Sequence, residues 1–208
     1  MTVRRLAPLL LLLALLTSCA GEGGTKAVHL SGPASGSSAP VPPAGPTDSA
    51  WVQLMIPMDD SAVALLDLAA ERSTRTGLRS WASRLRADLA TELAGLRGLR
   101  DGMRLPDTDV HQGHDMPGMV TATDLETARS TRGEAFDRLL VAQIRDHLRQ
   151  SERVSRSETS EGETPGARAR ARRLVADRGE QLADLAGLCP DGGADVPEPF
   201  ACPSDDPV

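Results

Sequence analysis

The residues best suited to chemistry in this chain lie in one short segment, 111–119, with the sequence HQGHDMPGM. His111 and His114 are three residues apart, and so are Met116 and Met119. Imidazole nitrogen and thioether sulfur both suit a soft or borderline ion such as copper or silver. The segment, which we call the His/Met linker, therefore predicts a copper site made of these four side chains.

A second interpretation of the His/Met linker stays open. Methionine also fills irregular gaps in apolar surfaces, so Met116 and Met119 could seat the linker on the folded domain while the two histidines remain solvated. Nothing in the sequence separates the two interpretations, and both can hold at once.

Motifs for catalysis are missing from the sequence. It has no glycine-rich phosphate loop, no recognisable nucleophile turn and no HExxH helix. The formal net charge of −6 and an aromatic content of 2% also argue against nucleic acid as a partner. We therefore expect a protein that binds without catalysing a reaction.

The elements that must position these residues are predicted by apolar side chains that recur every three or four positions, the spacing of amphipathic helices. Four such blocks cover residues 51–69, 78–99, 135–154 and 167–188. The second and fourth blocks also resemble each other: RLRADLATELAGLRGL (84–99) and RLVADRGEQLADLAGL (173–188) share nine identical positions. The chain therefore reads as a duplicated helical hairpin. Two such hairpins predict an all-α, antiparallel four-helix bundle.

Several segments resemble one family. LMIPMD (54–59), HDMPGM (114–119), FDRLL (136–140) and QIRDH (143–147) are similar to motifs of the "domain of unknown function 305" family. The resemblance, over residues 50–188, implies a ferritin-like bundle, export from a bacterial cell and, as in some members, copper binding. The family pattern has a His-His pair in each hairpin and a Gln-x-x-Glu pair on each second helix. Most of those residues are replaced here.

The residues at and beside these family positions, of which Glu92 and His147 keep the family residue, lie on or beside the helix stripes that face the interior, where polar groups must be paired or hydrated. They are Met58, Asp59, Glu92, Asp146, His147, Arg178 and Gln181. One hypothesis is a surviving metal site built from Met58, Glu92, Asp146 and His147. We favour the alternative, in which Arg178 pairs with Glu92 or Asp146 and neutralises charge as a cation would.

The N-terminus predicts export and lipid attachment. Arg4 and Arg5 precede an apolar run over 6–16, about half the ~20 residues that a membrane-spanning helix needs. The sequence Leu-Thr-Ser-Cys that follows resembles a bacterial lipobox. We therefore predict a signal peptide over 1–18 and a lipid-bearing Cys19. The Gly-, Ser- and Pro-rich segment over 19–47 is then a disordered tether.

The rest of the chain divides into a bundle domain over 48–188 and a tail over 189–208. In an oxidising compartment the two remaining cysteines, Cys189 and Cys202, are expected to form a disulfide that closes this tail. The sequence as a whole predicts a copper- or silver-binding lipoprotein on the extracytoplasmic face of the membrane. The alternative is a bundle that has lost its ligands and acts as a structural or interaction partner of another envelope protein.

Overall fold

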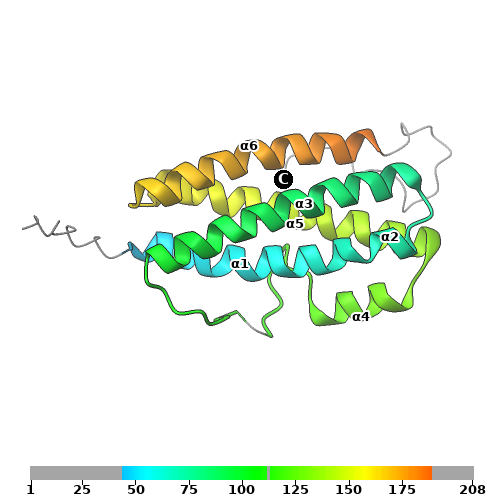
Figure 1. Cartoon of the computed structure of the whole chain (residues 1–208), viewed down its shortest axis with the longest axis horizontal. Helices are drawn as coiled ribbons and strands as arrows, with labels where there is room; N and C mark the ends of the chain where they lie inside the picture. Colours follow the sequence, from blue (N-terminus) through cyan, green and yellow to red (C-terminus); the bar gives the residue numbers. More distant parts are fainter. Residues whose placement is uncertain (1–43, 112, 189–208) are drawn as a thin grey trace, which may run out of the picture. The chain divides into compact units, whose positions relative to one another are not determined.

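The computed structural model describes residues 44–111 and 113–188, and this part of the chain is entirely helical (Figure 1). Its helices are α1 (Pro46–Asp67), α2 (Ala69–Arg72), α3 (Thr76–Gly102), α4 (Ala122–Ser130), α5 (Gly133–Glu161) and α6 (Pro165–Gly187). The four long ones, α1, α3, α5 and α6, contain the four predicted blocks, which confirms the all-α bundle. Within residues 44–111 and 113–188, no helix is long and apolar enough to cross a membrane.

The long helices form two hairpins, α1 with α3 and α5 with α6, which pack against each other chiefly through α1 and α5. Trp51 near the start of α1 donates a hydrogen bond to Ser155 near the end of α5. At the opposite end of the bundle, Thr74 before α3 donates to Asp137 at the start of α5. Neighbouring long helices are therefore antiparallel, as the sequence predicted.

The second hairpin begins at the opposite end of the bundle from the point where the first hairpin ends. Residues 103–132 must therefore run the length of the molecule, and Figure 1 shows this crossover connection beside α1. A single long crossover is the connectivity of ferritin-like bundles. The His/Met linker belongs to this connection, and so does α4, which the sequence analysis did not predict.

Local signals explain where the helices begin. Proline, which has no N–H to leave unbonded, occupies the first position of both α1 and α6. Thr121 and Asp124 form a capping box at the start of α4, in which each side chain accepts a hydrogen bond from the other residue's backbone N–H. The domain starts two residues before the predicted boundary, because Pro46 and Thr47 already belong to α1.

The interior contains two apolar clusters rather than one. The larger cluster is built around Leu65, Leu78, Leu85, Phe136 and Ile144, and the smaller around Trp51, Met55, Met58, Leu96 and Leu174. On each long helix, a polar residue separates the side chains that belong to one cluster from those that belong to the other. Burial of these aliphatic side chains supplies the main favourable energy of folding. The polar residues between the clusters form the first candidate site.

Candidate functional site

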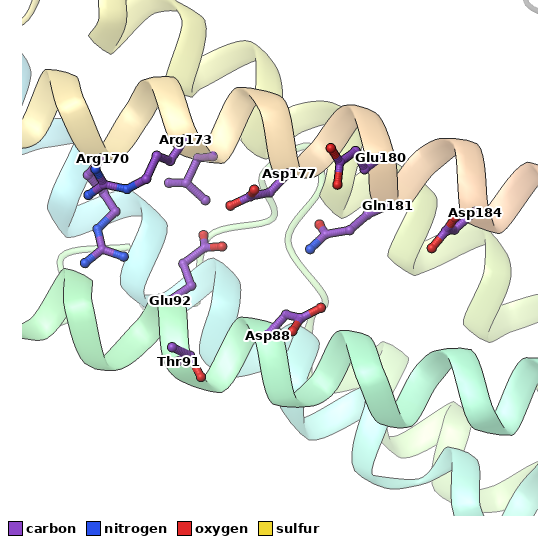
Figure 2. Close-up of a pocket in the computed structure, with 10 residues that line it drawn as sticks. Asp88, Thr91, Glu92, Arg170, Arg173, Asp177, Glu180, Gln181 and Asp184 are labelled. Carbon is purple, nitrogen blue, oxygen red and sulfur yellow. The ribbon is translucent and has the colours of Figure 1, made fainter. Parts of the chain in front are cut away.

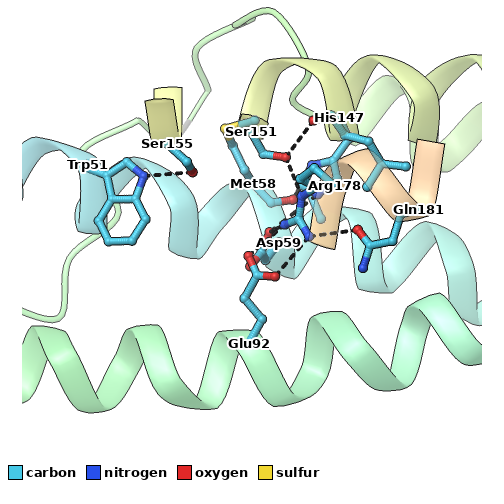
Figure 3. A network of polar contacts seen from close by, with 11 residues as sticks. Trp51, Met58, Asp59, Glu92, His147, Ser151, Ser155, Arg178 and Gln181 are labelled. Atoms are coloured by element: carbon cyan, nitrogen blue, oxygen red, sulfur yellow. Dashed lines mark hydrogen bonds and ion pairs between the residues drawn. The ribbon is translucent and has the colours of Figure 1, made fainter. Parts of the chain in front are cut away.

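The polar residues between the two clusters lie at one level of the bundle and come from all four long helices (Figure 3). We call this set the polar layer; it consists of Asp59, Glu92, His147, Ser151, Arg178 and Gln181. Asp59, His147, Ser151 and Arg178 are completely buried, and Glu92 is 8% exposed. Such groups are costly to bury, so their partners decide what the layer can do.

Arg178 is the centre of the polar layer. Its Nη2 and Nη1 donate to the two carboxylate oxygens of Glu92 at 2.7 and 3.0 Å, in a two-pronged ion pair. Its Nε donates to Ser151 Oγ at 2.7 Å, and its Nη1 also donates to Gln181 Oε1 at 3.0 Å. The structure therefore contains the Arg178–Glu92 ion pair that the sequence analysis favoured.

Asp59 and His147 are held less closely. Asp59 Oδ1 lies 3.5 Å from Arg178 Nη2 and 3.4 Å from His147 Nε2, beyond the usual range of N–H···O hydrogen bonds. Within residues 44–111 and 113–188, neither the Asp59 oxygens nor the His147 nitrogens have a hydrogen-bond partner. The layer is thus completely bonded around Arg178 and only loosely bonded on its α1 side.

Burial dominates the electrostatics of the layer. It raises the pKa of Asp59 to about 6 against the opposing effect of Arg178. Burial together with the charge of Asp59 raises the pKa of Glu92 to about 8, again opposed by Arg178. Burial and the charge of Arg178 lower the pKa of His147 to about 3. At neutral pH the two carboxyl groups therefore carry one proton and one negative charge, which balances Arg178 beside a neutral imidazole.

Two predicted members of this site lie elsewhere. Asp146 is exposed, and its nearest ionic partner is Arg145, at 3.9 Å on the neighbouring position of α5. The prediction that Asp146 faces the interior and could pair with Arg178 is wrong, because one step from His147 turns a side chain by about 100° around the helix. Met58 is buried, but it packs in the smaller apolar cluster. The polar layer therefore contains one carboxylate fewer than the predicted set.

The polar layer reaches the surface through a cleft between α3 and α6. The cleft has a volume of about 400 Å³, and Glu92 and Gln181 line it together with charged side chains of both helices. Figure 2 shows Arg170 and Arg173 toward one end and Asp184 toward the other. Arg178 itself does not line the cleft, so its partners Glu92 and Gln181 separate it from the solvent there.

The His/Met linker forms the second candidate site. His111, His114, Met116 and Met119 all line one groove of about 870 Å³. The two imidazole centroids are 6.5 Å apart, with the rings nearly perpendicular. Short turns hold the segment, because His114 N–H donates to the His111 carbonyl and Met119 N–H to the Met116 carbonyl, each at 3.0 Å. The four predicted ligands therefore line the same groove, and Met119 is also packed against the smaller apolar cluster.

Gly118 explains how the linker approaches α5 so closely. Its φ is +75°, and a Cβ at this position would lie 2.4 Å from Gln150 Cβ and 2.8 Å from the Asp146 carbonyl oxygen. Only glycine fits such a backbone without strain. The groove beside it is also lined by Asp146, which places that carboxylate near the linker rather than in the polar layer.

Sequence analysis missed two features of the interior. Ser151 lies one turn after His147 on the buried stripe of α5, a spacing that could have identified it. Asp48, at the start of α1, accepts hydrogen bonds from the backbone N–H and hydroxyl of Thr164 at 3.0 and 2.9 Å. Burial alone would raise the pKa of Asp48, but these hydrogen bonds hold it below its usual value. Burial beside Asp48 raises the pKa of Glu158 to about 8. Asp48 and Glu158 thus form a second buried acidic pair, near the α5–α6 turn.

Three predicted residues lie outside the described part of the chain. They are Cys19, Cys189 and Cys202, so the predicted lipidation and the predicted disulfide stay predictions.

Comparison with known proteins finds a family and several solved structures of similar fold. The model of a domain of unknown function (DUF305) matches residues 48–189. A DUF305 protein from Streptomyces coelicolor, described as secreted, superposes with a TM-score of 0.61 at 18% identity over 69% of this chain and 91% of that chain. A DUF305 fragment from Deinococcus radiodurans gives 0.63 at 18% identity over 71% and 97%. No curated protein matches the sequence.

Proposed function

We propose that this protein, which belongs to the DUF305 family, is an extracytoplasmic lipoprotein that binds a copper or silver ion without catalysing a reaction. The ligands are His111, His114, Met116 and Met119, and the anchor is a lipid on Cys19. The resemblance to the family favours export and copper binding, whereas the lipid anchor and this set of four ligands depend on the residues of this chain.

The observation that carries the proposal is the distance between the two imidazole rings. A metal–nitrogen bond of about 2 Å places an ion roughly 3 Å from a ring centroid, so two rings that share an ion have centroids about 5 Å apart in a tetrahedral site and at most about 6 Å apart in a linear one. The centroids of His111 and His114 are 6.5 Å apart, so binding an ion between them requires the two side chains to move closer together. Met116 and Met119 line the same groove and offer sulfur to the same ion.

The polar layer is the less suitable place for an ion. Both oxygens of Glu92 already accept hydrogen bonds from Arg178, whose fixed positive charge would repel a cation. Asp59 and His147 contribute only two further donor atoms in that position. We infer that the layer is structural and that metal binding belongs to the linker.

Export is supported by the N-terminal sequence and by a relative. Residues 1–18 have the charged start, apolar run and small-residue exit of a signal peptide. The S. coelicolor relative is described as secreted. Lipid attachment at Cys19 predicts that the mature protein fractionates with membranes, and that Cys19→Ala moves it to the soluble extracytoplasmic fraction.

Metal binding is tested by a competition titration of residues 20–208 with Cu(I). We expect about one equivalent to bind, and the combined change of His111, His114, Met116 and Met119 to alanine to abolish binding. The matched control is His29→Ala with Met103→Ala, which removes residues of the same types that are not among the four proposed ligands and should leave uptake unchanged. If the unmodified domain takes up no Cu(I), the proposal of metal binding is wrong.

One observation favours a second function. Met119 packs against the smaller apolar cluster, as expected if the methionines only seat the connection on the bundle. In that case the protein is a structural or interaction lipoprotein of the envelope. The same titration separates the two functions, because a seating role predicts no bound copper.

A further inference from the structure

The outer side of the α5–α6 hairpin is rich in arginine. Arg149, Arg153 and Arg156 follow one another on α5 at spacings of four and three, and Arg168 and Arg172 on α6 at a spacing of four. Residues at these spacings share one side of a helix. All five side chains are exposed. We call this set the arginine face.

The two groups of arginines adjoin across the hairpin. On α5, Asp146 lines the linker groove beside α1. At about 100° per residue, Arg149 and Arg156 lie roughly 60–80° round the helix from Asp146, on the outer side, whereas Arg153 lies within about 20° of it. On α6, Arg170 and Arg173 line the cleft toward α3, and Arg168 and Arg172 lie away from it, toward α5. The arginine face therefore flanks the line along which α5 and α6 pack.

Few carboxylates lie among the arginines. Glu152 pairs with Arg156, and Asp146 lies one turn before Arg149, which itself has a partner. The electrostatic effect of Arg168 also reaches Glu158, but that side chain is buried. The arginine face is thus locally positive in a chain whose formal net charge is −6.

Helix stability does not account for the arginines of α6. The N-terminus of a helix carries a partial positive charge, so basic side chains in the first turns are unfavourable and acidic ones favourable. Arg168 and Arg172 lie in the first turns of α6, whereas the exposed acids Asp177, Glu180 and Asp184 lie in its second half. Arg168, the fourth residue of α6, opposes the helix dipole, whereas Arg172 lies beyond the first turn, where the dipole has little effect.

The location of the arginine face indicates which partner. Asp48, at the start of α1, accepts a hydrogen bond from Thr164 in the α5–α6 turn, so the chain enters the bundle at that end. Residue 44 is separated from Cys19 by about 25 residues, which span at most roughly 90 Å when fully extended. A lipid on Cys19 therefore keeps this end of the bundle within reach of the membrane surface.

We propose that the arginine face docks on the anionic phosphate headgroups of the membrane that holds the anchor. For its location this proposal rests on the lipid anchor of the proposed function, and it is independent of metal binding. Guanidinium groups recognise phosphate through paired hydrogen bonds, and each arginine near an anionic surface strengthens binding roughly fivefold.

Vesicle co-sedimentation tests the proposal. Residues 20–208, which contain the whole described bundle but no lipid, are mixed at low salt with vesicles of phosphatidylcholine alone or with about a quarter phosphatidylglycerol. We expect binding only to the anionic vesicles, with a steep decrease as salt is added. The variant Arg168→Glu with Arg172→Glu should weaken this binding by about tenfold or more.

The matched control changes two exposed arginines elsewhere, Arg84→Glu on α3 and Arg129→Glu on α4, and so alters the net charge equally. We expect it to bind anionic vesicles within about twofold of the unmodified domain. Equal losses in the two variants would show a bulk charge effect and overturn the proposal, as would no binding by the unmodified domain. The His/Met linker variant should bind vesicles normally, and Cys19→Ala tests the anchor separately, so failure of either function is distinguishable from failure of docking.

Discussion

The polar layer and the His/Met linker both contain side chains that can bind a metal, yet the structure uses them in opposite ways. In the layer, Arg178 is completely buried and saturates Glu92, so the charges are balanced within the protein. In the linker, His114 is exposed and Met116 is half-buried, and both residues line a groove. The comparison teaches that burial with an internal cation makes ligand-type residues structural, and that partial exposure keeps them available.

The largest expected effect comes from breaking the layer. Arg178→Ala leaves one buried negative charge without its partner and should lower the free energy of unfolding by about 3–5 kcal/mol. The measurement is urea denaturation at neutral pH, with Arg173→Ala, on the exposed side of the same helix, expected to change stability by less than about 0.5 kcal/mol. If Arg178→Ala does not fold, Arg178→Lys should give an intermediate loss. A loss in Arg178→Lys no larger than in the control would contradict a structural role.

The next effect is a loss of stability at alkaline pH. Asp59 and Glu92 have pKa values raised to about 6 and 8, so the folded state binds more protons than the unfolded state does. Their contribution is complete below the unfolded pKa values near 4, and it is lost as pH rises through about 6 and then 8. We expect the free energy of unfolding to fall by about 2 kcal/mol or more between pH 6 and 9.

Substitutions assign this pH dependence. Asp59→Asn removes one of the two ionising groups and should flatten most of the decline, whatever it does to absolute stability. Glu158→Gln isolates the smaller share of the second acidic pair, because burial raises the pKa of Glu158 to about 8 as well. His147 acts in the opposite direction: its pKa is lowered to about 3, so its contribution is lost as pH falls below about 6.5. If the free energy of unfolding of the unmodified domain does not change with pH, the raised pKa values of Asp59 and Glu92 are refuted.

A smaller effect is expected where the linker meets α5. Gly118→Ala adds a side chain at positive φ against Gln150 and should cost about 1–3 kcal/mol. Gly113→Ala is the matched control, because Gly113 also has positive φ but no atom lies within 4 Å of its added Cβ. It should show only the backbone cost, about 1 kcal/mol. Equal losses in thermal or urea denaturation would mean that the close approach of the linker to α5 is unimportant.

The smallest effect separates the two roles of the methionines. Met119 packs against the apolar cluster, so Met119→Ala should lower stability by about 1 kcal/mol, and Met116→Ala by less than about 0.5 kcal/mol. If both are also ligands, each variant should weaken Cu(I) binding in the competition titration. A stability loss in Met119→Ala with unchanged copper affinity would assign Met119 to packing alone.

The sequence predicted the four long helices because each has a stripe of aliphatic residues at helical spacing. It did not predict α4, whose short segment offers only Leu125 and Ala128 as apolar contacts with the bundle. Its start is specified by the Thr121–Asp124 capping box, a local signal that apolar spacing does not detect.

For the candidate sites, the charges of the residues predicted more than their positions in the sequence did. An arginine among carboxylates on inward stripes was enough to predict that Arg178 pairs with Glu92 or Asp146, and the structure shows Glu92. Which of two neighbouring residues faces inward was harder, because Asp146 and His147 differ by a single helical step near the edge of a stripe. The approach of the two linker histidines depends on turns and on Gly118, and the spacing of ligand residues does not specify these.

The polar layer also has a consequence for the alignment of the helices. Two aliphatic clusters made mostly of leucine and alanine would tolerate a helix sliding lengthwise by one turn, about 5.4 Å, with little change in buried area. Such a slip would bring Arg178 opposite leucine and strand Glu92 without a partner. The polar layer therefore favours a single axial alignment of the four helices. This alignment also fixes where the long connection, with its two histidines, lies along the bundle.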